Sequence, residues 1–198
     1  FEGLKLYLHD NEFKTVEIHN LRLAFEEVTG EDLNWFFNQW FLSAGHPIIE
    51  LEKSYADGKL TVTVKQTQDG PDVPEAFEIP TTIYILQANG MVREKEIRIT
   101  KRTEAFEFTL NDTPLLVNFD ADKVLLGQVN QNYEKSEAIA LYNNANHFLD
   151  KTEAIILIKN KKDSSSLDLI DKALEDNFWY VRKSAIQAIK NLAKTRPA

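Results

Sequence analysis

The sequence contains no cysteine, which excludes disulfide bonds, thiolate catalysis and cysteine-type zinc sites together. Glycine is also scarce, with 7 residues among 198. None of these glycines forms GxGxxG, GxxxxGK or GxSxG, the motifs of dinucleotide sites, phosphate loops and nucleophile elbows. Apolar runs such as residues 154–158 are far shorter than the ~20 residues of a membrane helix, and no charged-then-apolar leader opens the sequence. We therefore expect a soluble globular chain without a membrane segment, and the sequence leaves its compartment open.

Acidic residues outnumber basic ones, with 31 Asp and Glu against 23 Lys and Arg. Nucleic-acid-binding proteins concentrate basic residues on one face, so we expect no DNA or RNA partner. The balance is uneven: residues 151–198 hold 10 basic and 6 acidic residues, whereas residues 1–150 hold 13 and 25. The basic tail could dock on the acidic remainder or simply present solvated helix faces, and the sequence leaves both readings open.

Residues 1–45 have the pattern of helices. Apolar residues follow helical spacing up to Val28, and Gly30 then ends that helix because it tolerates the left-handed conformation. A second helix is predicted to follow, with Glu31 and Asp32 in its first turn, where they suit the helix dipole. Its apolar stripe consists of Leu33, Phe36, Phe37, Trp40 and Phe41. Trp35 lies off this stripe, so we expect the helix to be wedged between two bodies.

From Pro47 to about Asp120 the hydrophobic period changes to two, which indicates β-strands. Turn residues interrupt the pattern at 57–58, 69–71 and 89–90. The predicted strands occupy residues 46–55, 59–67, 75–80, 81–87, 91–100, 103–110 and 114–120. This number and spacing of strands predict an immunoglobulin-like antiparallel β-sandwich.

Beyond Val129 the helical period returns and glycine and proline nearly vanish. The stretches 146–158 and 177–189 align with an offset of 31 residues. The matched pairs are Lys151 with Arg182, Ala154 with Ala185, Ile155 with Ile186, and Ile158 with Ile189. Such a period predicts stacked helix pairs of the HEAT-like α-helical repeat kind, and chance similarity between two amphipathic helices is the alternative.

Candidates for chemistry are few. The four histidines, His9, His19, His46 and His147, lie far apart, and none begins the HExxH motif of zinc hydrolases. We expect His46 to be packed or hydrogen-bonded at a domain joint rather than to act as a metal ligand or base.

Two further patterns have both a chemical and a structural reading. The acid pairs at 69 and 72 and at 120 and 122 could bind calcium, but turn capping is the expected role because an EF-hand loop needs a longer series of oxygens. Trp179 and Tyr180 could stack on a ligand, but at the entry of a repeat they are expected to be packing residues.

One stretch has a distinctive order of motifs. Residues 21–52, LRLAFEEVTGEDLNWFFNQWFLSAGHPIIELE, run from a helix ending in Val-Thr-Gly through Asp-Leu, paired aromatics and Gln-Trp to Gly-His-Pro. This stretch closely resembles the end of the catalytic domain of zinc metallopeptidases of the aminopeptidase N family. The resemblance covers residues 1–52 by motif, and the later order of strands and helices agrees with that family by pattern only.

The resemblance implies that the parent protein is an enzyme that removes N-terminal residues from peptides with a zinc-activated water. It also implies that the zinc ligands, the general base and the oxyanion partner precede this region, so no catalytic and no metal residue is assigned here. The chain begins at Phe1 within a helical pattern, so we expect it to be a piece of a longer protein and to be inactive alone. The partners expected on this reading are the missing catalytic domain and, for the parent, peptide substrates.

We therefore predict three domains: catalytic-domain helices at 1–45, the β-sandwich at 46–128, and the start of a helical-repeat domain at 129–198. The predicted structural junction between the first two consists of Phe36, Phe37, Trp40, Phe41, Gly45, His46 and Pro47. The proposed role is that of a spacer flanking the active site. The alternative is a complete protein-interaction module without enzymatic activity.

Overall fold

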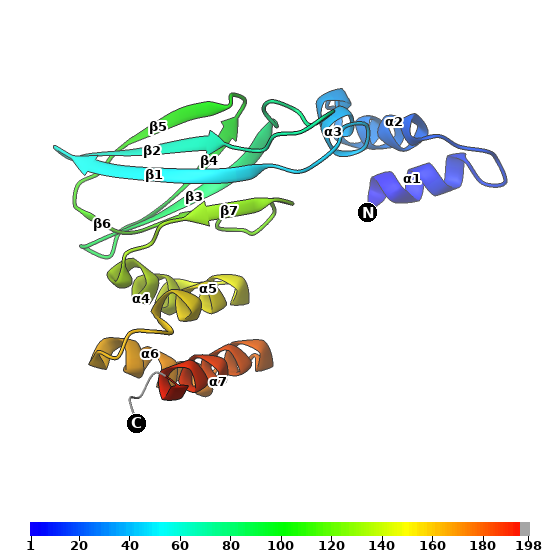
Figure 1. The fold of residues 1–198 in the computed structure, drawn as a ribbon. Coiled ribbons are helices and arrows are strands. Elements are labelled where there is room, and N and C mark those ends of the chain that lie inside the picture. The colour runs from blue at the N-terminus through cyan, green and yellow to red at the C-terminus, as the bar shows by residue number, and fades with distance from the viewer. Residues whose placement is uncertain (195–198) are drawn as a thin grey trace.

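The computed structural model describes residues 1–194, and Figure 1 shows three consecutive regions: N-terminal helices, two β-sheets and C-terminal helices. The mixed helical and β composition predicted from the sequence is confirmed. Within the described residues, no helix has both the length and the apolar character needed to cross a bilayer. The predicted C-terminal region extends to residue 198, so its last residues, 195–198, lie outside the described part.

Two N-terminal helices, α1 (Glu2–Asp10) and α2 (Ile18–Thr29), pack against each other. The absence of a side chain at Gly3 permits this contact, because a Cβ there would lie 3.1 Å from the ring of Phe25. Helix α2 ends as predicted at Gly30, which has a φ of 72° and donates its N–H to the carbonyl oxygen of Glu26.

Helix α3 (Asn34–Trp40) begins later than the sequence predicted, which corrects the placement of the two acids in its first turn. The carboxylate of Asp32 instead accepts a hydrogen bond from the backbone N–H of Asn34 at 2.8 Å. The backbone and side-chain hydrogen bonds from Asn34 lower the pKa of Asp32. The acid therefore precedes the helix and satisfies one of its free N–H groups.

Seven strands within the described residues form two sheets, with orders β5-β2-β1-β7 and β4-β3-β6. Hairpins join β1 to β2 and β3 to β4 at the predicted turns, while the predicted turn at 69–71 lies in the connection that carries the chain between the sheets. The strands are β1 (Ile48–Ala56), β2 (Lys59–Gln66), β3 (Ile79–Gln87), β4 (Val92–Ile99), β5 (Thr103–Thr109), β6 (Pro114–Phe119) and β7 (Gln128–Gln131).

The two sheets share one hydrophobic core. In β2 the alternate residues Leu60, Val62 and Val64 are almost fully buried, as the period of two predicts. The opposite sheet contributes Ile83 and Ile85 of β3 to the same cluster. Burial of such apolar side chains is the main stabilising contribution to this region.

The predicted strand set is wrong in two places. Residues 75–80 do not form a strand of their own, because Ile79 and Pro80 begin β3. The short β7 was not predicted, and it pairs in parallel with β1, so the arrangement is not purely antiparallel. The sequence of β7, Gln-Val-Asn-Gln, has a single apolar residue and therefore lacks the alternation that identifies a strand.

Two helix pairs follow the sheets and lie in successive layers below them (Figure 1). The first pair is α4 (Lys135–Asn144) and α5 (Phe148–Ile158), and the second is α6 (Ser164–Leu174) and α7 (Trp179–Lys194). All four helices contribute to a second hydrophobic core, which also includes Leu86 and Leu116 of the sheet formed by β4, β3 and β6. The helices are therefore anchored directly on that sheet.

Candidate functional site at the two junctions

The first junction joins α3 to the beginning of β3 through a side-chain amide. Gln39 donates from Nε2 to the carbonyl oxygen of Glu78 and accepts at Oε1 from the N–H of Glu78, each at 2.8 Å. Gln39 is 8% exposed, so both bonds lie largely out of competition with water. Its amide thus takes the place that a neighbouring strand would occupy beside Glu78.

Aromatic side chains of α3, which the sequence analysis named as junction residues, lie in different environments. Phe37 is buried and stacks on Phe41 with a ring-centroid distance of 4.8 Å. Trp40 is half-buried and lies 5.4 Å from the ring of the fully buried Phe77. Phe36 and Phe41, in contrast, are 37% and 49% exposed. One side of α3 therefore packs on the sheets, and the other remains open within the described residues.

The corner after α3 is formed by Gly45, His46 and Pro47. Gly45 has a φ of 75°, and a Cβ there would lie 3.0 Å from Val73, so both backbone strain and crowding favour glycine. Pro47 is buried and its carbonyl oxygen accepts from the N–H of Gln128 at the start of β7. His46 is exposed and has no hydrogen bond or ion pair with another residue of the described part of the chain, so its predicted packing at the joint is not seen there.

An apolar groove of about 560 Å³ opens beside this first junction. It lies between α3, the first residues of β3 and the loop at 124–126. Its only charged lining residue, Glu78, forms an ion pair with Arg98, whose guanidinium also lies over the ring of Trp35 at 4.7 Å. The groove therefore suits an apolar segment better than a charged ligand.

The second junction joins the sheets to α4 and α5 and contains two shielded ion pairs. Nζ of Lys53 in β1 lies 2.6 Å from Oε1 of Glu137 in α4. Nζ of Lys123, in the loop after β6, lies 2.7 Å from Oδ1 of Asp150 in α5, whose side chain is 2% exposed. This oxygen accepts no aligned hydrogen bond from the described residues. The positive charge of Lys123 therefore compensates for the burial of its negative charge.

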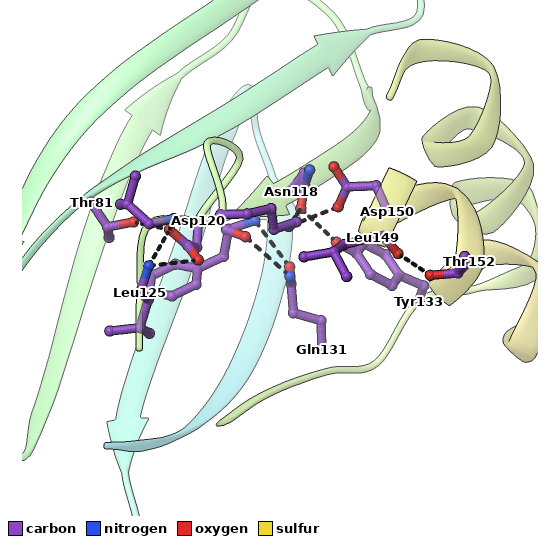
Figure 2. Close-up of polar contacts among 12 residues, drawn as sticks. Thr81, Asn118, Asp120, Leu125, Gln131, Tyr133, Leu149, Asp150 and Thr152 are labelled. Atoms are coloured by element: carbon purple, nitrogen blue, oxygen red, sulfur yellow. Dashed lines mark hydrogen bonds and ion pairs between the residues drawn. The ribbon is translucent and has the colours of Figure 1, made fainter. Parts of the chain in front are cut away.

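Tyr133 stands between the two ion pairs. Its hydroxyl donates to Oδ1 of Asn118 at 3.0 Å, and Nζ of Lys53 lies 4.8 Å from its ring centroid. Figure 2 shows Tyr133, Asn118 and Asp150 grouped beside the edge of the sheets. Burial raises the pKa of Tyr133 far above its usual range, and the nearby charges of Glu153, Asp150 and Glu137 act in the same direction. The phenol therefore stays neutral and acts as a hydrogen-bond donor.

A polar network continues from this point into the loop after β6 (Figure 2). The carboxylate of Asp120 accepts from the backbone N–H groups of Val124 and Leu125 and from the hydroxyl of Thr81. Asp120 itself has a φ of 51°, a strained conformation that these bonds hold in place. Asp122 accepts from the hydroxyl of Thr82 at 2.8 Å. The acid pair at 120 and 122 thus shapes a loop, in agreement with the turn-capping expectation.

Buried glutamines are the feature that the sequence interpretation missed. Like Gln39, Gln131 bonds both backbone groups of one residue, at 3.0 Å to the N–H and 3.3 Å to the carbonyl oxygen of Phe119. Gln66 does the same for Phe77. Each glutamine supplies hydrogen-bond partners for the backbone of a residue in or just before a strand. The available signal was a glutamine on the inward-facing register of a strand, as at Gln66 in β2.

A half-buried acid on α5 completes the second junction. Burial raises the pKa of Glu153, Lys123 opposes this shift, and the negative charge of Asp150 reinforces it. Glu153 borders a hollow of about 300 Å³ that is also lined by Lys123, Gln131 and Leu149. The junction therefore holds two acids of α5 around a single lysine.

The described residues bring no zinc-like constellation together. Within residues 1–194, no three side chains of the His, Cys, Asp or Glu type form a group able to hold a metal ion. His9 pairs with Asp10 and His19 with Glu17 on the N-terminal helices, while His147 precedes α5. The donor set in this part of the chain thus does not fit the zinc that the family resemblance implies for the parent.

Comparisons with known proteins find similarity to aminopeptidases. No protein-family model matches it. The chain is 24% identical over 121 residues to aminopeptidase N of Haemophilus influenzae, an alignment that covers 54% of this chain and 14% of that protein. Its fold matches a crystal structure of Legionella pneumophila aminopeptidase A in complex with aspartic acid, with a TM-score of 0.73 and 16% identity, over 100% of this chain and 25% of the other. The chain thus spans a quarter or less of the length of these two proteins, and the resemblance predicted from residues 1–52 is confirmed.

Proposed function

Because this chain is related to aminopeptidases, we propose that it is a non-catalytic C-terminal portion of a zinc-dependent enzyme that removes N-terminal residues from peptides. The proposal is carried by one observation: the whole chain matches a quarter of an aminopeptidase A. The absence of HExxH from the sequence supports placing the reactive metal in another part of the parent.

The role that we propose for the chain is structural. The first junction would hold the catalytic part at a fixed angle to the sheets, since Gln39 and Trp40 contact Glu78 and Phe77 there. The second junction would hold the helices to the sheets through Lys53, Lys123 and the apolar side chains around Leu116. The helical region would then flank the active site of the parent and limit access of peptides to it.

We also propose the finer fold assignments on this basis. The core shared by the two sheets supports an immunoglobulin-like β-sandwich with one parallel strand added. The 31-residue offset between α5 and α7 supports two HEAT-like repeats. The proposed domains remain 1–45, 46–128 and 129–198, and the last boundary falls at the first residue of β7, Gln128.

Two experiments test this proposal. The coding sequence upstream of Phe1 is expected to encode HExxH and a downstream glutamate, and an unrelated domain or a start codon at that point would favour the interaction module instead. The 198-residue chain is expected to show no turnover of aminoacyl-arylamide substrates with added zinc. Hydrolysis that a chelator abolishes would contradict a non-catalytic role.

A further inference from the structure

The turn between β3 and β4 contains a dipeptide that is open to a spontaneous chemical modification. Asn89 is the only asparagine of the sequence that a glycine follows. Asn89 and Gly90 are both exposed at the tip of this hairpin. The backbone nitrogen of one residue can attack the side-chain carbonyl of a preceding asparagine, and glycine obstructs this attack least because it has no Cβ.

A hydrogen bond folds the side chain of Asn89 back over the turn. Its Oδ1 accepts from the N–H of Met91, two residues further along the chain, at 2.9 Å. Such a bond holds the side-chain carbonyl close to the backbone of the residue between them, which is Gly90. The donor also polarises the carbonyl and stabilises the negative charge that forms on its oxygen during an attack. The turn therefore brings the two reacting groups together.

The nitrogen of Gly90 takes part in the same turn. Its N–H donates to the carbonyl oxygen of Gln87 at 2.9 Å, and this bond has to open before the nitrogen can react. Residues 88–92 are all exposed, so water can replace the carbonyl oxygen as the acceptor. A Cβ placed on Gly90 would have no neighbour within 4 Å apart from the adjoining residues, so the space around the nitrogen is open. The reaction therefore needs only a local movement of the tip.

We propose that Asn89 is a deamidation site, at which the chain acquires a negative charge and, in part, an isoaspartate. The nitrogen of Gly90 attacks Cγ of Asn89, the new N–Cγ bond forms, and the bond between Cγ and the side-chain nitrogen breaks. The proton lost by the nitrogen of Gly90 leaves with the side-chain nitrogen as ammonia, and a cyclic succinimide remains. Water then opens the ring, at Cγ to give aspartate or at the main-chain carbonyl of residue 89 to give isoaspartate. The reaction needs water alone, so the proposal stands independently of the proposed function.

The two products differ in their effect on the hairpin. Aspartate keeps an oxygen that can accept from the N–H of Met91, so the turn can persist. Isoaspartate lengthens the main chain by one carbon before Gly90, so this bond and the bond from Gly90 to Gln87 lose their geometry. Gln87 is fully buried, and its Oε1 accepts from the N–H of Asn111 in the loop before β6. Isoaspartate is therefore expected to loosen a turn that is connected to a second loop of the sheets.

Peptide mapping by mass spectrometry tests the site. The 198-residue chain is incubated for several weeks in warm, mildly alkaline buffer, and the conversion of each asparagine to aspartate or isoaspartate is followed. We expect Asn89 to convert about tenfold faster than Asn111, which is also exposed but is followed by Asp112. Asn89→Gln should abolish the fast conversion, because its longer side chain would have to close a larger ring, and circular dichroism checks that this variant is folded. Conversion of Asn89 no faster than that of Asn111, or aspartate without any isoaspartate, would overturn the proposal.

Hydrogen exchange tests the effect on the turn. The isoaspartate form, separated by chromatography, is expected to exchange the amide of Met91 about tenfold faster than the unmodified chain. Asn89→Asp is the matched control, because it carries the same added charge and keeps an acceptor for the N–H of Met91. Its exchange at Met91 should stay close to that of the unmodified chain. Equal acceleration in both forms would assign the effect to the charge rather than to the longer main chain, and would overturn the proposed loosening.

Discussion

Gln39 and Glu78 form a reciprocal pair in which one side-chain amide bonds both backbone groups of the other residue. They lie 39 positions apart in the sequence, and they tie α3 to the first residues before β3. These two hydrogen bonds, together with the aromatic packing, fix the position of α3 relative to the start of β3.

Removal of the Gln39 amide should open the first junction. Gln39→Ala leaves the N–H and carbonyl oxygen of Glu78 without partners in a largely buried site, so we expect a loss of about 1–3 kcal/mol in the free energy of unfolding. Asn38→Ala, an exposed neighbour on the same helix, should change it by no more than about 0.5 kcal/mol. Urea denaturation measures both, and native-state hydrogen exchange should show faster exchange at the amide of Glu78. Equal protection of that amide in both variants would contradict a stabilising role for the Gln39–Glu78 hydrogen bonds.

Truncation of Trp40 should loosen the same junction through lost packing. Trp40→Ala removes the contact with Phe77, and we expect a loss of about 2–4 kcal/mol. Phe41→Ala is the control, because Phe41 is 49% exposed and should cost much less. Limited proteolysis is expected to cut the Trp40 variant faster between Ser43 and Pro47. Unchanged cleavage there would mean that Trp40 does not hold α3 on the sheets.

Removal of one partner of the Lys123–Asp150 ion pair should destabilise the chain more than removal of both partners. Lys123→Met strands a carboxylate that is 2% exposed, so we expect a loss of about 3–5 kcal/mol. Adding Asp150→Leu should recover most of this loss, since two apolar side chains can replace a shielded pair. The exposed pair of Lys59 and Glu107 is the comparison, and Lys59→Met should cost about 0–1 kcal/mol. Thermal and urea unfolding distinguish these cases, and additive losses at Lys123 and Asp150 would count against a coupled pair.

Glu153 should make the chain less stable as the pH rises. Its pKa in the folded state lies above the ordinary value of 4.5 because burial disfavours the carboxylate. The folded state therefore binds this proton more tightly than the unfolded state, and stability falls as the pH rises from 4.5 through the raised pKa. Glu153→Gln removes the ionisation, so it should stabilise the chain at neutral pH and lose this advantage near pH 4.5. Urea unfolding across this range measures the difference, and a difference that does not vary with pH would exclude Glu153 as its source.

Local patterns predicted those parts of the fold that local chemistry determines. Gly30 ends α2 because a left-handed residue was required there, and residues 57–58 and 89–90 form hairpin turns for the same kind of reason. Alternation identified β2, since its buried residues face one shared core. The resemblance to aminopeptidases could also be predicted, because it rests on a distinctive order of residues in one stretch, 21–52.

Contacts between distant segments were not predictable in this way. The polar strand β7 exists because β1 offers it backbone partners, and nothing within Gln128–Gln131 signals that. The roles of Gln39 and Gln131 depend on which backbone groups lack a neighbour after folding, which is a property of the tertiary structure. Of the predicted junction residues, Phe37 and Pro47 are buried and Trp40 packs on Phe77. Phe36, Phe41, Gly45 and His46 are exposed.

The connection between the sheets and the C-terminal helices is short and closely surrounded by contacts. Only residues 132–134 separate β7 from α4, and two ion pairs and an apolar core flank that short connection. The corner at Gly45 is held in its own way, because the N–H of Ala44 donates to the carbonyl oxygen of Asp72. The sheets and the C-terminal helices would therefore move together as one body.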